Sequence, residues 1–450
     1  MYDVVGIGFG PANLALAIAI DDYNRTVSPQ ERVKALFLER REVFSWHPGM
    51  MLPGVTMQIS FLKDLVSFRD VTHPLSFLAY AQGRGRLEHF VNKQTFFPSR
   101  EEFSDYLSWA AEAVADQVWY GAEVISVTVE PTEGAAVIKL ASGEELHTRA
   151  VVHAPGLQPR LPEGIERSAR LVHTHEILDV AAHRLLSPRQ VVVIGAGQSA
   201  AEVVEYLHAQ DDETTVHAVF SKVGYTPADD SPFANRIFDP EMVDRWHAAP
   251  QGVRDRMFAY HRGTNYSAVD PELIESLYNR EYEERVTGRR RLFMHNCTEM
   301  LECVEDDDGV TVTVRDLMTG ELSTLRADLV VFGSGYRQAD PIELFGNDAQ
   351  WYRHDGVRPE VLRDYRWSPK QDGAPDVFLN GGVEHSHGLT SSLLSNLAVR
   401  SGEILERLIE LQAANLPNDS VREHSAADEE AGAETGVISE QAGKRFAPTR

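Results

Sequence analysis

A single lysine, Lys63, lies in the mostly apolar stretch MQISFLKD, and the amide of Gln58 stands near the start of that stretch. Two asparagines, Asn235 and Asn265, follow much later in SPFAN and GTNYS. An amino acid needs one cation for its carboxylate and neutral acceptors for its ammonium group, and this set supplies both without a second positive charge. We therefore expect an amino-acid site. The alternative is a solvated lysine whose stem covers apolar surface, beside Asp64.

Two glycine turns indicate nucleotide sites. The first, Gly8-x-Gly10-x-x-Asn13, joins the strand pattern YDVVGIGFG to the helical pattern PANLALAIAI, with Pro11 near the helix start. The first glycine makes a tight turn, the second lets the backbone approach a pyrophosphate, and the helix N-terminus offers N–H groups and a positive dipole. A small residue is expected at the third position for close packing, and Asn13 is imperfect there.

The second turn, Gly195-x-Gly197-x-x-Ala200, lies in RQVVVIGAGQSAAEVVEYLHA, between an apolar run and an amphipathic stretch. One such turn is weak evidence for a nucleotide, because glycine turns also serve packing alone. Two turns in one chain, each between a strand and a helix, are much stronger evidence. The sequence therefore predicts two dinucleotide sites.

The residue that ends the next strand distinguishes the two sites. After the first turn, VKALFLE ends in Glu39, whose carboxylate suits a free ribose 2′-hydroxyl. After the second turn, TVHAVF is followed by Ser221 and Lys222, and a hydroxyl with a cation suits a 2′-phosphate. We expect FAD at the first site and NADPH at the second. The alternative for Lys222 is a solvated surface lysine.

A third glycine turn completes the first nucleotide domain. The strand pattern LVVFGSGYR, with Gly335 and Tyr336, returns the chain to that domain, so the NADPH unit is inserted within the FAD domain. The sequence thus predicts an α/β fold of two Rossmann-like domains and a smaller, mostly helical substrate-binding segment. The expected division is 1–165 for the first part of the FAD domain, 166–325 for the NADPH domain with the insertion at about 225–290, 326–412 for the return segment and 413–450 for a disordered acidic tail.

Helices and further strands can be placed between these turns. Residues 99–115 predict a helix that begins with a capping box of Ser99 and Glu102. DPELIESLYNREYEERV predicts a helix in the insertion, and LTSSLLSNLAVRSGEILERLIELQAA predicts one long helix near the C-terminus. Strands are expected at EVISVTVE, AAVIKLA, AVVHAPG and DVFLNGG.

Composition excludes several classes of function. The 450 residues carry a formal net charge of −25, which disfavours nucleic acid, and no polybasic run suits a membrane surface. The apolar run LALAIAI is too short to cross a bilayer, and the start of the chain has no signal-peptide pattern. We expect no nucleic-acid or membrane partner and a cytoplasmic location.

The cysteines and a histidine pair are the remaining candidates for chemistry. Cys297 and Cys303 form neither a CxxC pair nor a disulfide framework, which fits a reduced compartment. A flavoprotein disulfide reductase would need a redox-active pair, so the sequence disfavours that function. His385 and His387 have no evident third metal ligand. We expect them to be packed or to face a flavin, and we expect no metal.

Taken together, the motifs resemble those of the flavin-dependent N-hydroxylating monooxygenases, and within them the L-ornithine N5-monooxygenases of siderophore biosynthesis. The similar stretches follow one another in order from residue 3 to about residue 405, and only the acidic tail lies outside them. They are GIGFGPANLAL, FSWHPGMMLPGVTMQISFLKDLV, GAGQSAAE, DDSPFANRIFDP, TNYSAVDPELIE, FGSGYR and HSHGLTSSLLS.

The resemblance implies roles for individual residues. Catalysis would involve Gln58, Arg100 and Asn265. The amino acid's carboxylate and α-amino group would be held by Lys63, Asn235 and Asn265, with Gln58 also at the substrate. The cofactors would be bound by Gly8, Gly10, Pro11, Asn13, Glu39, Trp46, His47, Met57, Gln58, Arg100, Gly195, Gly197, Gln198, Ser199, Ser221, Lys222, Gly335, Tyr336, Leu389 and Ser391.

Two positions depart from the family pattern. Arg236, in FANR, replaces an acid beside a binding asparagine, which bears on substrate identity. Ser221 replaces an arginine common near the 2′-phosphate, which leaves Lys222 to serve.

The resemblance also implies a reaction. NADPH would reduce FAD by hydride transfer, O2 would add at the flavin C4a carbon to give a hydroperoxide, and the deprotonated side-chain amine of L-ornithine would attack the distal oxygen. The products would be N-hydroxyornithine, water and NADP. A homo-oligomer, often a tetramer, is the family's usual assembly. Two alternatives stay open: an N-hydroxylase of L-lysine or a diamine, and a flavoprotein that only binds NADPH.

Overall fold

The computed structural model describes residues 1–179 and 188–415. By its contacts the chain divides into a unit Met1–Leu408, which holds both sheets discussed below, and a unit Ile409–Arg450. The described part of the second unit is the end of helix α12 (Leu397–Asn415). The acidic tail that the sequence predicts beyond this helix lies outside the described residues.

The first sheet is the scaffold of the first glycine turn. Its strands follow the order β3-β2-β1-β6-β5-β4, and β17 pairs in parallel with β6. Strand β1 pairs in parallel with β2 and β6, as in a Rossmann fold. The strands are β1 (Tyr2–Ile7), β2 (Ala35–Glu39), β3 (Val118–Tyr120), β4 (Val124–Glu130), β5 (Ala135–Leu140), β6 (Glu145–His153) and β17 (Asp376–Leu379).

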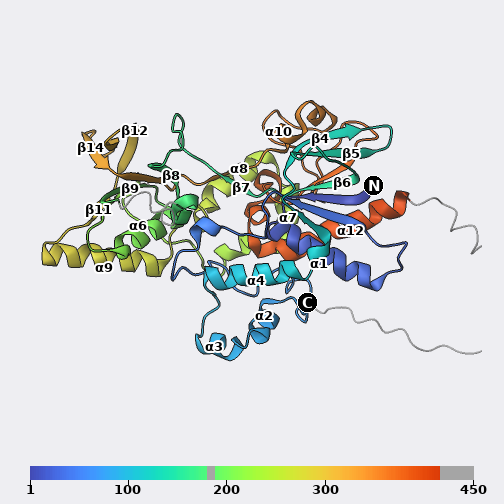
Figure 1. The fold of residues 1–450 in the computed structure, drawn as a ribbon, viewed down its shortest axis with the longest axis horizontal. Coiled ribbons are helices and arrows are strands. Elements are labelled where there is room, and N and C mark those ends of the chain that lie inside the picture. The colour runs from blue at the N-terminus through green and yellow to red at the C-terminus, as the bar shows by residue number, and fades with distance from the viewer. Residues whose placement is uncertain (180–187, 416–450) are drawn as a thin grey trace, which may run out of the picture. The chain divides into compact units, whose positions relative to one another are not determined.

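Helices pack beside this first sheet (Figure 1). Helix α1 (Pro11–Thr26) has Pro11 in its first turn, and its residues 13–20 are all buried. Helix α4 (Arg100–Glu112) packs beside α1, and Ser99 caps it by accepting a hydrogen bond from the Glu102 backbone N–H at 3.1 Å. The predicted start of α4 is therefore confirmed, although the helix ends earlier than residue 115. The shorter helices of this part of the chain are α2 (Phe77–Gly83), α3 (Leu87–Asn92), α10 (Pro341–Phe345) and α11 (Glu384–His387).

The second sheet carries the second glycine turn and consists of parallel strands in the order β11-β10-β9-β15-β8. Its strands are β8 (Leu171–His173), β9 (Gln190–Ile194), β10 (Thr215–Val219), β11 (Leu292–His295) and β15 (Leu329–Phe332). Strand β15 therefore belongs to this sheet, whereas the predicted division placed residues 329–332 in the return segment. The return to the first sheet is made by β17, because β15 forms its hydrogen bonds with β8 and β9.

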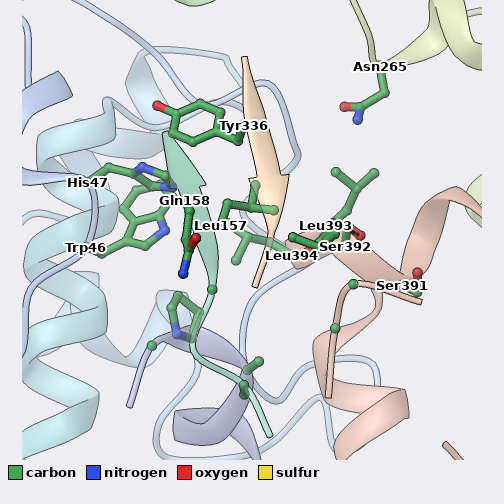
Figure 2. A pocket seen from close by; sticks show the side chains of 18 of the residues that line it. Trp46, His47, Leu157, Gln158, Asn265, Tyr336, Ser391, Ser392, Leu393 and Leu394 are labelled. Carbon is green, nitrogen blue, oxygen red and sulfur yellow. Dashed lines mark hydrogen bonds between the residues drawn. The ribbon is translucent and has the colours of Figure 1, made fainter. Parts of the chain in front are cut away.

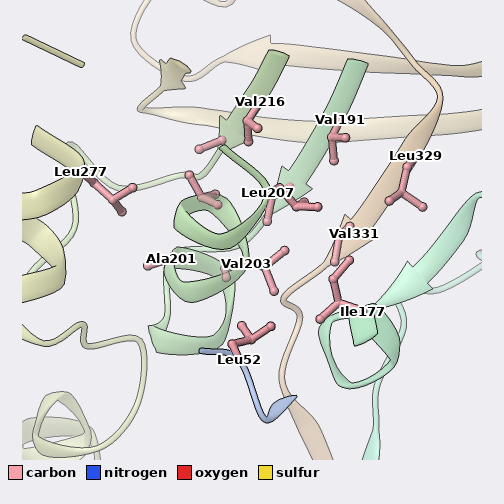
Figure 3. Packing of buried hydrophobic residues seen from close by; sticks show 14 of the residues in the cluster. Leu52, Ile177, Val191, Ala201, Val203, Leu207, Val216, Leu277, Leu329 and Val331 are labelled. Atoms are coloured by element: carbon pink, nitrogen blue, oxygen red, sulfur yellow. The ribbon is translucent and has the colours of Figure 1, made fainter. Parts of the chain in front are cut away.

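Helix α6 (Gln198–Gln210) packs on one face of the second sheet, and Figure 3 shows its Val203 and Leu207 beside Val191 and Val331 from the strands. Leu52, from the first nucleotide unit, joins the same buried cluster. The opposite face is covered by an antiparallel sheet, β12 (Thr298–Asp306), β13 (Gly309–Asp316) and β14 (Leu322–Ala327). Apolar packing thus holds the two nucleotide units together as well as each sheet.

Two chain segments cross between the sheets side by side. Strand β7 (Leu157–Pro159) leaves the first sheet, β16 (Tyr336–Gln338) leads back toward it, and the two pair antiparallel. This arrangement confirms that one Rossmann-type domain is inserted within the other. The predicted inserted segment contains the helices α7 (Pro240–Ala248), α8 (Gln251–His261) and α9 (Pro271–Thr287). Of these, α9 packs on α6, while α7 packs on α11.

The single long helix predicted near the C-terminus is interrupted. Two 3-10 turns, Leu389–Ser392 and Leu394–Asn396, precede α12, and Leu393 between them is extended. In this interrupted stretch the Ser391 carbonyl accepts a hydrogen bond from a side chain, Nη1 of Arg400, at 2.5 Å. Within residues 1–179 and 188–415, none of the helices is long and apolar enough to span a membrane.

Candidate functional site

One cavity of about 2390 Å³ joins the first glycine turn, the start of α6 and the inserted segment. A pocket for one small ligand occupies about 300–1,000 Å³, so this cavity has room for more than one. Figure 2 shows part of its wall, with Trp46, His47 and Tyr336 near the strands β7 and β16. It is lined by Gly8, Gly10, Pro11, Glu39, Trp46, His47, Met57, Gln58, Lys63, Arg100, Gln198, Ser199, Asn235, Asn265, Tyr336 and Ser391, all predicted from the sequence.

The first glycine turn has the shape that a dinucleotide requires. Gly8 has φ +84°, and a Cβ there would lie 2.5 Å from the Ala154 carbonyl oxygen. A Cβ on Gly10 would meet nothing within 4 Å, so this backbone faces open space at the N-terminus of α1. The turn therefore fits a pyrophosphate that approaches the backbone.

Asn13 is the buried third residue of that turn, and it does not line the cavity. Its Nδ2 donates to the Gly8 carbonyl at 2.7 Å, and its Oδ1 accepts from Nδ2 of Asn380 at 3.2 Å. The amide thus ties the turn to the chain that follows β17. Asparagine is therefore well suited to a position that appeared imperfect in the sequence.

Glu39 lies at the end of β2, where the sequence predicts a ribose contact. Its Oε2 accepts from the Phe9 backbone N–H at 2.9 Å, and its Oε1 accepts from the Arg41 N–H at 3.0 Å. These bonds fix the carboxylate beside the glycine turn and at the cavity wall. The residues of this first site thus fit an FAD molecule.

The second glycine turn is also close-packed. Gly195 has φ +140°, and a Cβ there would lie 2.6 Å from the Gly333 carbonyl oxygen. A Cβ on Gly333 would in turn lie 2.7 Å from Cβ of Ala200, the third residue of the motif. Gly195 and Gly197 therefore shape the turn from outside the cavity lining, while Gln198 and Ser199 at the start of α6 reach the cavity.

Ser221 and Lys222 follow β10 and lie outside the cavity lining. The Lys222 ammonium donates to the Ser267 carbonyl at 2.6 Å and to the Thr226 hydroxyl at 3.3 Å. Partial burial lowers the pKa of Lys222, and the charge of Arg262 lowers it further. A second cation therefore stands near Lys222, contributed by the inserted segment.

Lys63 reaches the same cavity from the first unit. Burial lowers the pKa of its ammonium, while the carboxylate of Asp239 has the opposite effect. Nζ lies 5.8 Å from the centre of the Phe238 ring. Asp64 is buried and accepts hydrogen bonds from Ser67 and Phe77 instead, so it does not serve as the neutralising neighbour considered from the sequence.

The two asparagines come from the inserted segment. Nδ2 of Asn235 donates to the Asp230 carbonyl at 2.7 Å, and Asn265 follows a 3-10 turn, with its amide shown in Figure 2. Both line the cavity that Lys63 lines. Arg236, the departure from the family pattern, lies 3.6 Å from Asp239 and is exposed. It therefore pairs with the acid that also acts on Lys63.

Four further predicted residues lie at the cavity wall. Met57 is buried at the cavity wall. Trp46, His47 and Tyr336 form a cluster of rings, with the His47 ring 5.0 Å from the Trp46 ring and 6.3 Å from the Tyr336 ring, centre to centre. Burial lowers the pKa of His47 to about 4, with further lowering from the charges of His175 and Arg100. An uncharged imidazole therefore faces the cavity at neutral pH.

Two predicted cofactor residues and the cysteines lie away from the cavity lining. Leu389 is buried in a cluster with Ile237 and Trp246, and Gly335 is exposed beside Tyr336. Cys297 and Cys303 do not line the cavity either. This placement removes the basis for a disulfide reductase, which needs its cysteines at the flavin.

The histidine pair is packed. His385 Nε2 lies 2.9 Å from the Pro359 carbonyl oxygen, and His387 stacks on Tyr365 with a centroid distance of 4.3 Å. His387 is buried, and His385 also lines the cavity. The expectation of packed histidines is met, and that of no bound metal stays a prediction.

Three residues at the site were missed by the sequence reasoning. Arg400 is buried in α12 and lines the cavity; its Nε donates to Oδ1 of Asn380 at 2.8 Å. Glu202, buried in α6, pairs with Arg100 at 2.7 Å. Asp270 accepts from Nε2 of Gln58. Each lies inside a stretch already quoted from the sequence: LAVRSGE, GAGQSAAE and VDPELIE. A charged residue within an apolar or small-residue stretch is the feature that could have identified them as buried functional residues.

Comparison with known proteins agrees with this geometry. Residues 1–338 match the profile of the family described as L-lysine 6-monooxygenase/L-ornithine 5-monooxygenase. The L-ornithine N(5)-monooxygenase of Burkholderia cepacia is 37% identical over 403 residues, which cover 86% of this chain and 90% of that protein. The enzyme of the same name from Pseudomonas aeruginosa is 34% identical over 444 residues, covering 95% of this chain and 98% of that protein.

Solved structures give the same result for the fold. The ornithine N-hydroxylase from Kutzneria sp. 744, solved with reduced FAD, NADP⁺ and L-ornithine, has a TM-score of 0.87 at 40% identity and covers 92% of this chain and 100% of that one. The L-lysine 6-monooxygenase from Pseudomonas syringae has a TM-score of 0.80 at 30% identity, covering 91% and 99%. The chain therefore belongs to the L-lysine 6-monooxygenase/L-ornithine 5-monooxygenase family of flavin-dependent N-hydroxylating monooxygenases.

Proposed function

We propose that this protein hydroxylates the side-chain amine of L-ornithine at N5, with NADPH and O2 as co-substrates, to supply N-hydroxyornithine for a siderophore or a related natural product. The observation that carries the proposal is the placement of Lys63, Asn235 and Asn265 on one cavity that also reaches the first glycine turn and the start of α6, directly after the second. In addition, identity is higher to the ornithine N-hydroxylase, at 40%, than to the lysine 6-monooxygenase, at 30%.

The amino acid would be held at its α-carbon end. The Lys63 ammonium would pair with the carboxylate, since among the described residues it forms no ion pair within 4.0 Å, and Asp239, the acid that acts on its pKa, is already paired with Arg236. The amide oxygens of Asn235 and Asn265 would accept from the α-ammonium group. Fixing this end would set how far the side-chain amine reaches into the cavity. The rate of N-hydroxylation depends on that reach, because the amine must lie close to the oxygen that it attacks.

The two nucleotides would bind at the two glycine turns. FAD would lie on the turn of Gly8 and Gly10 with its ribose at Glu39, and it supplies the activation of O2. NADPH would lie on the turn of Gly195 and Gly197, next to Gln198 and Ser199. Trp46, His47 and Tyr336 would form an apolar, uncharged wall that keeps water away from the reacting groups.

The choice of NADPH over NADH would rest on the cations at the end of β10. Lys222 and the nearby Arg262 would both act on a 2′-phosphate. The sequence pattern assigned this role to Lys222 alone. Arg262 comes from the inserted segment. It would supply the positive charge that is lost where Ser221 replaces an arginine.

One experiment separates this function from its alternatives. The FAD-loaded protein is mixed with NADPH, O2 and one amine at a time, and hydroxylated product is measured together with NADPH oxidation. We expect product from L-ornithine and little from L-lysine, whose amine is one methylene further from the carboxylate. Putrescine, which has no carboxylate, should also react poorly. If L-lysine or a diamine gave more product than L-ornithine, the protein would be an N-hydroxylase of that amine. If no amine gave product, it would be a flavoprotein that only binds NADPH.

A further inference from the structure

Asp270 stands at the N-cap of helix α9, a position where aspartate ordinarily accepts a hydrogen bond from a backbone N–H of the first turn. Here its side chain makes no such bond. Its carboxylate accepts instead from two glutamine amides: Oδ1 from Nε2 of Gln58 at 3.1 Å, and Oδ2 from Nε2 of Gln198 at 2.8 Å. A side chain that caps its helix stabilises that helix, so Asp270 forgoes local stability to reach the site.

The two bonds fix how both amides are turned. The Asp270 backbone N–H donates to Oε1 of Gln198 at 2.8 Å, so both ends of that amide are held by one residue. Gln58 is held only by its nitrogen, and within the described chain its Oε1 accepts no hydrogen bond. An amide has its oxygen opposite its NH2 group, and Gln58 lines the cavity. Its oxygen is thus left as an acceptor for a bound ligand.

These contacts join the two nucleotide sites. Gln58 belongs to the first unit, in the stretch that also carries Lys63, while Gln198 begins helix α6 beside the second glycine turn. One carboxylate therefore sets the relative position of a group at the predicted flavin site and a group at the predicted NADPH site. Asp270 itself begins the helix α9, which packs on α6.

The charged groups around Asp270 leave its carboxylate without a cation of its own. Among the described residues no arginine, lysine or histidine forms an ion pair with it within 4.0 Å. Burial is the largest cause of the raised pKa of Asp270; the charge of Glu272 also raises it, while the hydrogen bonds from the two glutamines and the charge of Arg100 lower it. The Arg100 guanidinium is bound to Glu202, whose Oε1 also accepts from Gln198 at 3.0 Å. The Asp270 carboxylate therefore acts as a hydrogen-bond acceptor for the two glutamines and forms no ion pair with a described residue.

We propose that Asp270 is a positioning residue of the N-hydroxylation reaction, which holds the Gln58 amide oxygen toward the cavity and holds Gln198 at the NADPH turn. This inference rests on the proposed function. A purely structural aspartate at this position would cap its helix, and Asp270 does not.

The test uses the full-length, FAD-loaded enzyme with the variant Asp270→Asn. Asparagine is as good an N-cap residue and has the same size, but it offers one acceptor oxygen, and its NH2 group opposes one of the two glutamine NH2 groups. Two quantities are measured: the NADPH concentration that half-saturates anaerobic flavin reduction, and the hydroxylated L-ornithine formed per NADPH oxidised. The matched control is Glu275→Gln, which removes one negative charge from an exposed position on the same helix.

We expect Asp270→Asn to raise the half-saturating NADPH concentration or lower the yield of product per NADPH by about 10-fold or more, the effect of losing one hydrogen bond to a charged group. FAD content and thermal midpoint should stay at wild-type values, as in the control. The double variant with Gln58→Ala should lower the product yield no further than Gln58→Ala alone, because the two residues act through one contact.

Three results would overturn the proposal: both quantities unchanged in Asp270→Asn, additive losses of yield in the double variant, or loss of FAD or of folding, which would show a structural role. Failure of the proposed function is a separate result, since a wild-type enzyme that forms no product from L-ornithine would still report on Gln198 through the anaerobic reduction by NADPH.

Discussion

The guanidinium of Arg100 and the carboxylate of Glu202 form a two-point ion pair between helix α4 of the first nucleotide unit and helix α6 of the second. Nη2 lies 2.7 Å from Oε1, and Nη1 lies 2.9 Å from Oε2. The two side chains are only 14% and 2% exposed. Nη1 also donates to the Met50 carbonyl at 2.8 Å. Two opposite charges are therefore buried together between the two nucleotide units, next to the cavity.

Removal of one partner should be costly. In Glu202→Gln the Arg100 charge stays buried without its counter-charge, and we expect the free energy of unfolding to fall by about 3–5 kcal/mol. Urea denaturation of the FAD-loaded protein measures this change. Arg189→Gln is the control, because it breaks a pair with Glu213 in which both side chains are exposed, and it should cost less than about 1 kcal/mol. Equal losses in the two variants would show that the Arg100–Glu202 pair contributes no more than a surface pair.

Stability should fall in acid through His217, on the second sheet. Its Nδ1 lies 3.0 Å from Nε2 of His295, and burial, followed by the charge of His295, lowers its pKa from 6.5 to about 4. The unfolded chain therefore binds the extra proton between these two values, so the free energy of unfolding decreases as the pH falls from 6.5 to about 4. His217→Gln should flatten the decrease over this window in unfolding experiments. An unchanged slope would assign the pH dependence to other groups.

Coenzyme choice should depend on Lys222. Lys222→Ala removes one charge-assisted contact to the 2′-phosphate, so KM for NADPH should rise by about 10- to 150-fold while KM for NADH barely moves. Steady-state oxidation of both coenzymes checks this expectation. Arg262→Ala should act in the same direction, because the two cations are close enough to affect each other. Equal losses with NADPH and NADH would mean that Lys222 is not the discriminating residue.

FAD affinity should depend on the charge of Arg400. Its guanidinium is buried at the cavity wall and is held by Asn380 and Ser391, with no carboxylate within 4.0 Å among the described residues. The diphosphate of FAD would supply the missing negative charge. Arg400→Met should therefore weaken FAD binding by about 10-fold or more, and Arg400→Lys should weaken it less, because lysine keeps the charge but loses the planar fork that is bound to Asn380 and Ser391. Fluorescence titration of FAD measures both, and equal affinity of the two variants would contradict the electrostatic role.

Local patterns predicted the elements of this fold well. Strand, glycine turn and helix follow one another within a few residues of the chain, so periodicity and turn chemistry were sufficient for β1 with α1 and for β9 with α6. Pairing between distant segments is a different matter. Strand β15 joined the second sheet because of hydrogen bonds with β8 and β9, and no feature of its own sequence specifies that choice.

The same limit applies to the site. Lys63 could be singled out as a cation in an apolar stretch, but its local neighbour Asp64 turned out to be bound to backbone N–H groups. The role of Asn13 depends on Asn380, 367 residues further along the chain. Asp270 would have been read as a helix cap, which is what its position predicts. Only the three-dimensional structure shows that its carboxylate is directed at two glutamines.

The most direct test of the account compares L-ornithine with putrescine in the wild type and in Lys63→Ala, with Lys139→Ala as an exposed control. If Lys63 binds the α-carboxylate, Lys63→Ala should raise KM for L-ornithine by about 10- to 150-fold and leave the weak reaction with putrescine unchanged, because putrescine has no carboxylate to lose. FAD content and NADPH oxidation without substrate should persist, with more reducing equivalents released as hydrogen peroxide. A normal KM and a normal yield of hydroxylated L-ornithine in Lys63→Ala would contradict the account.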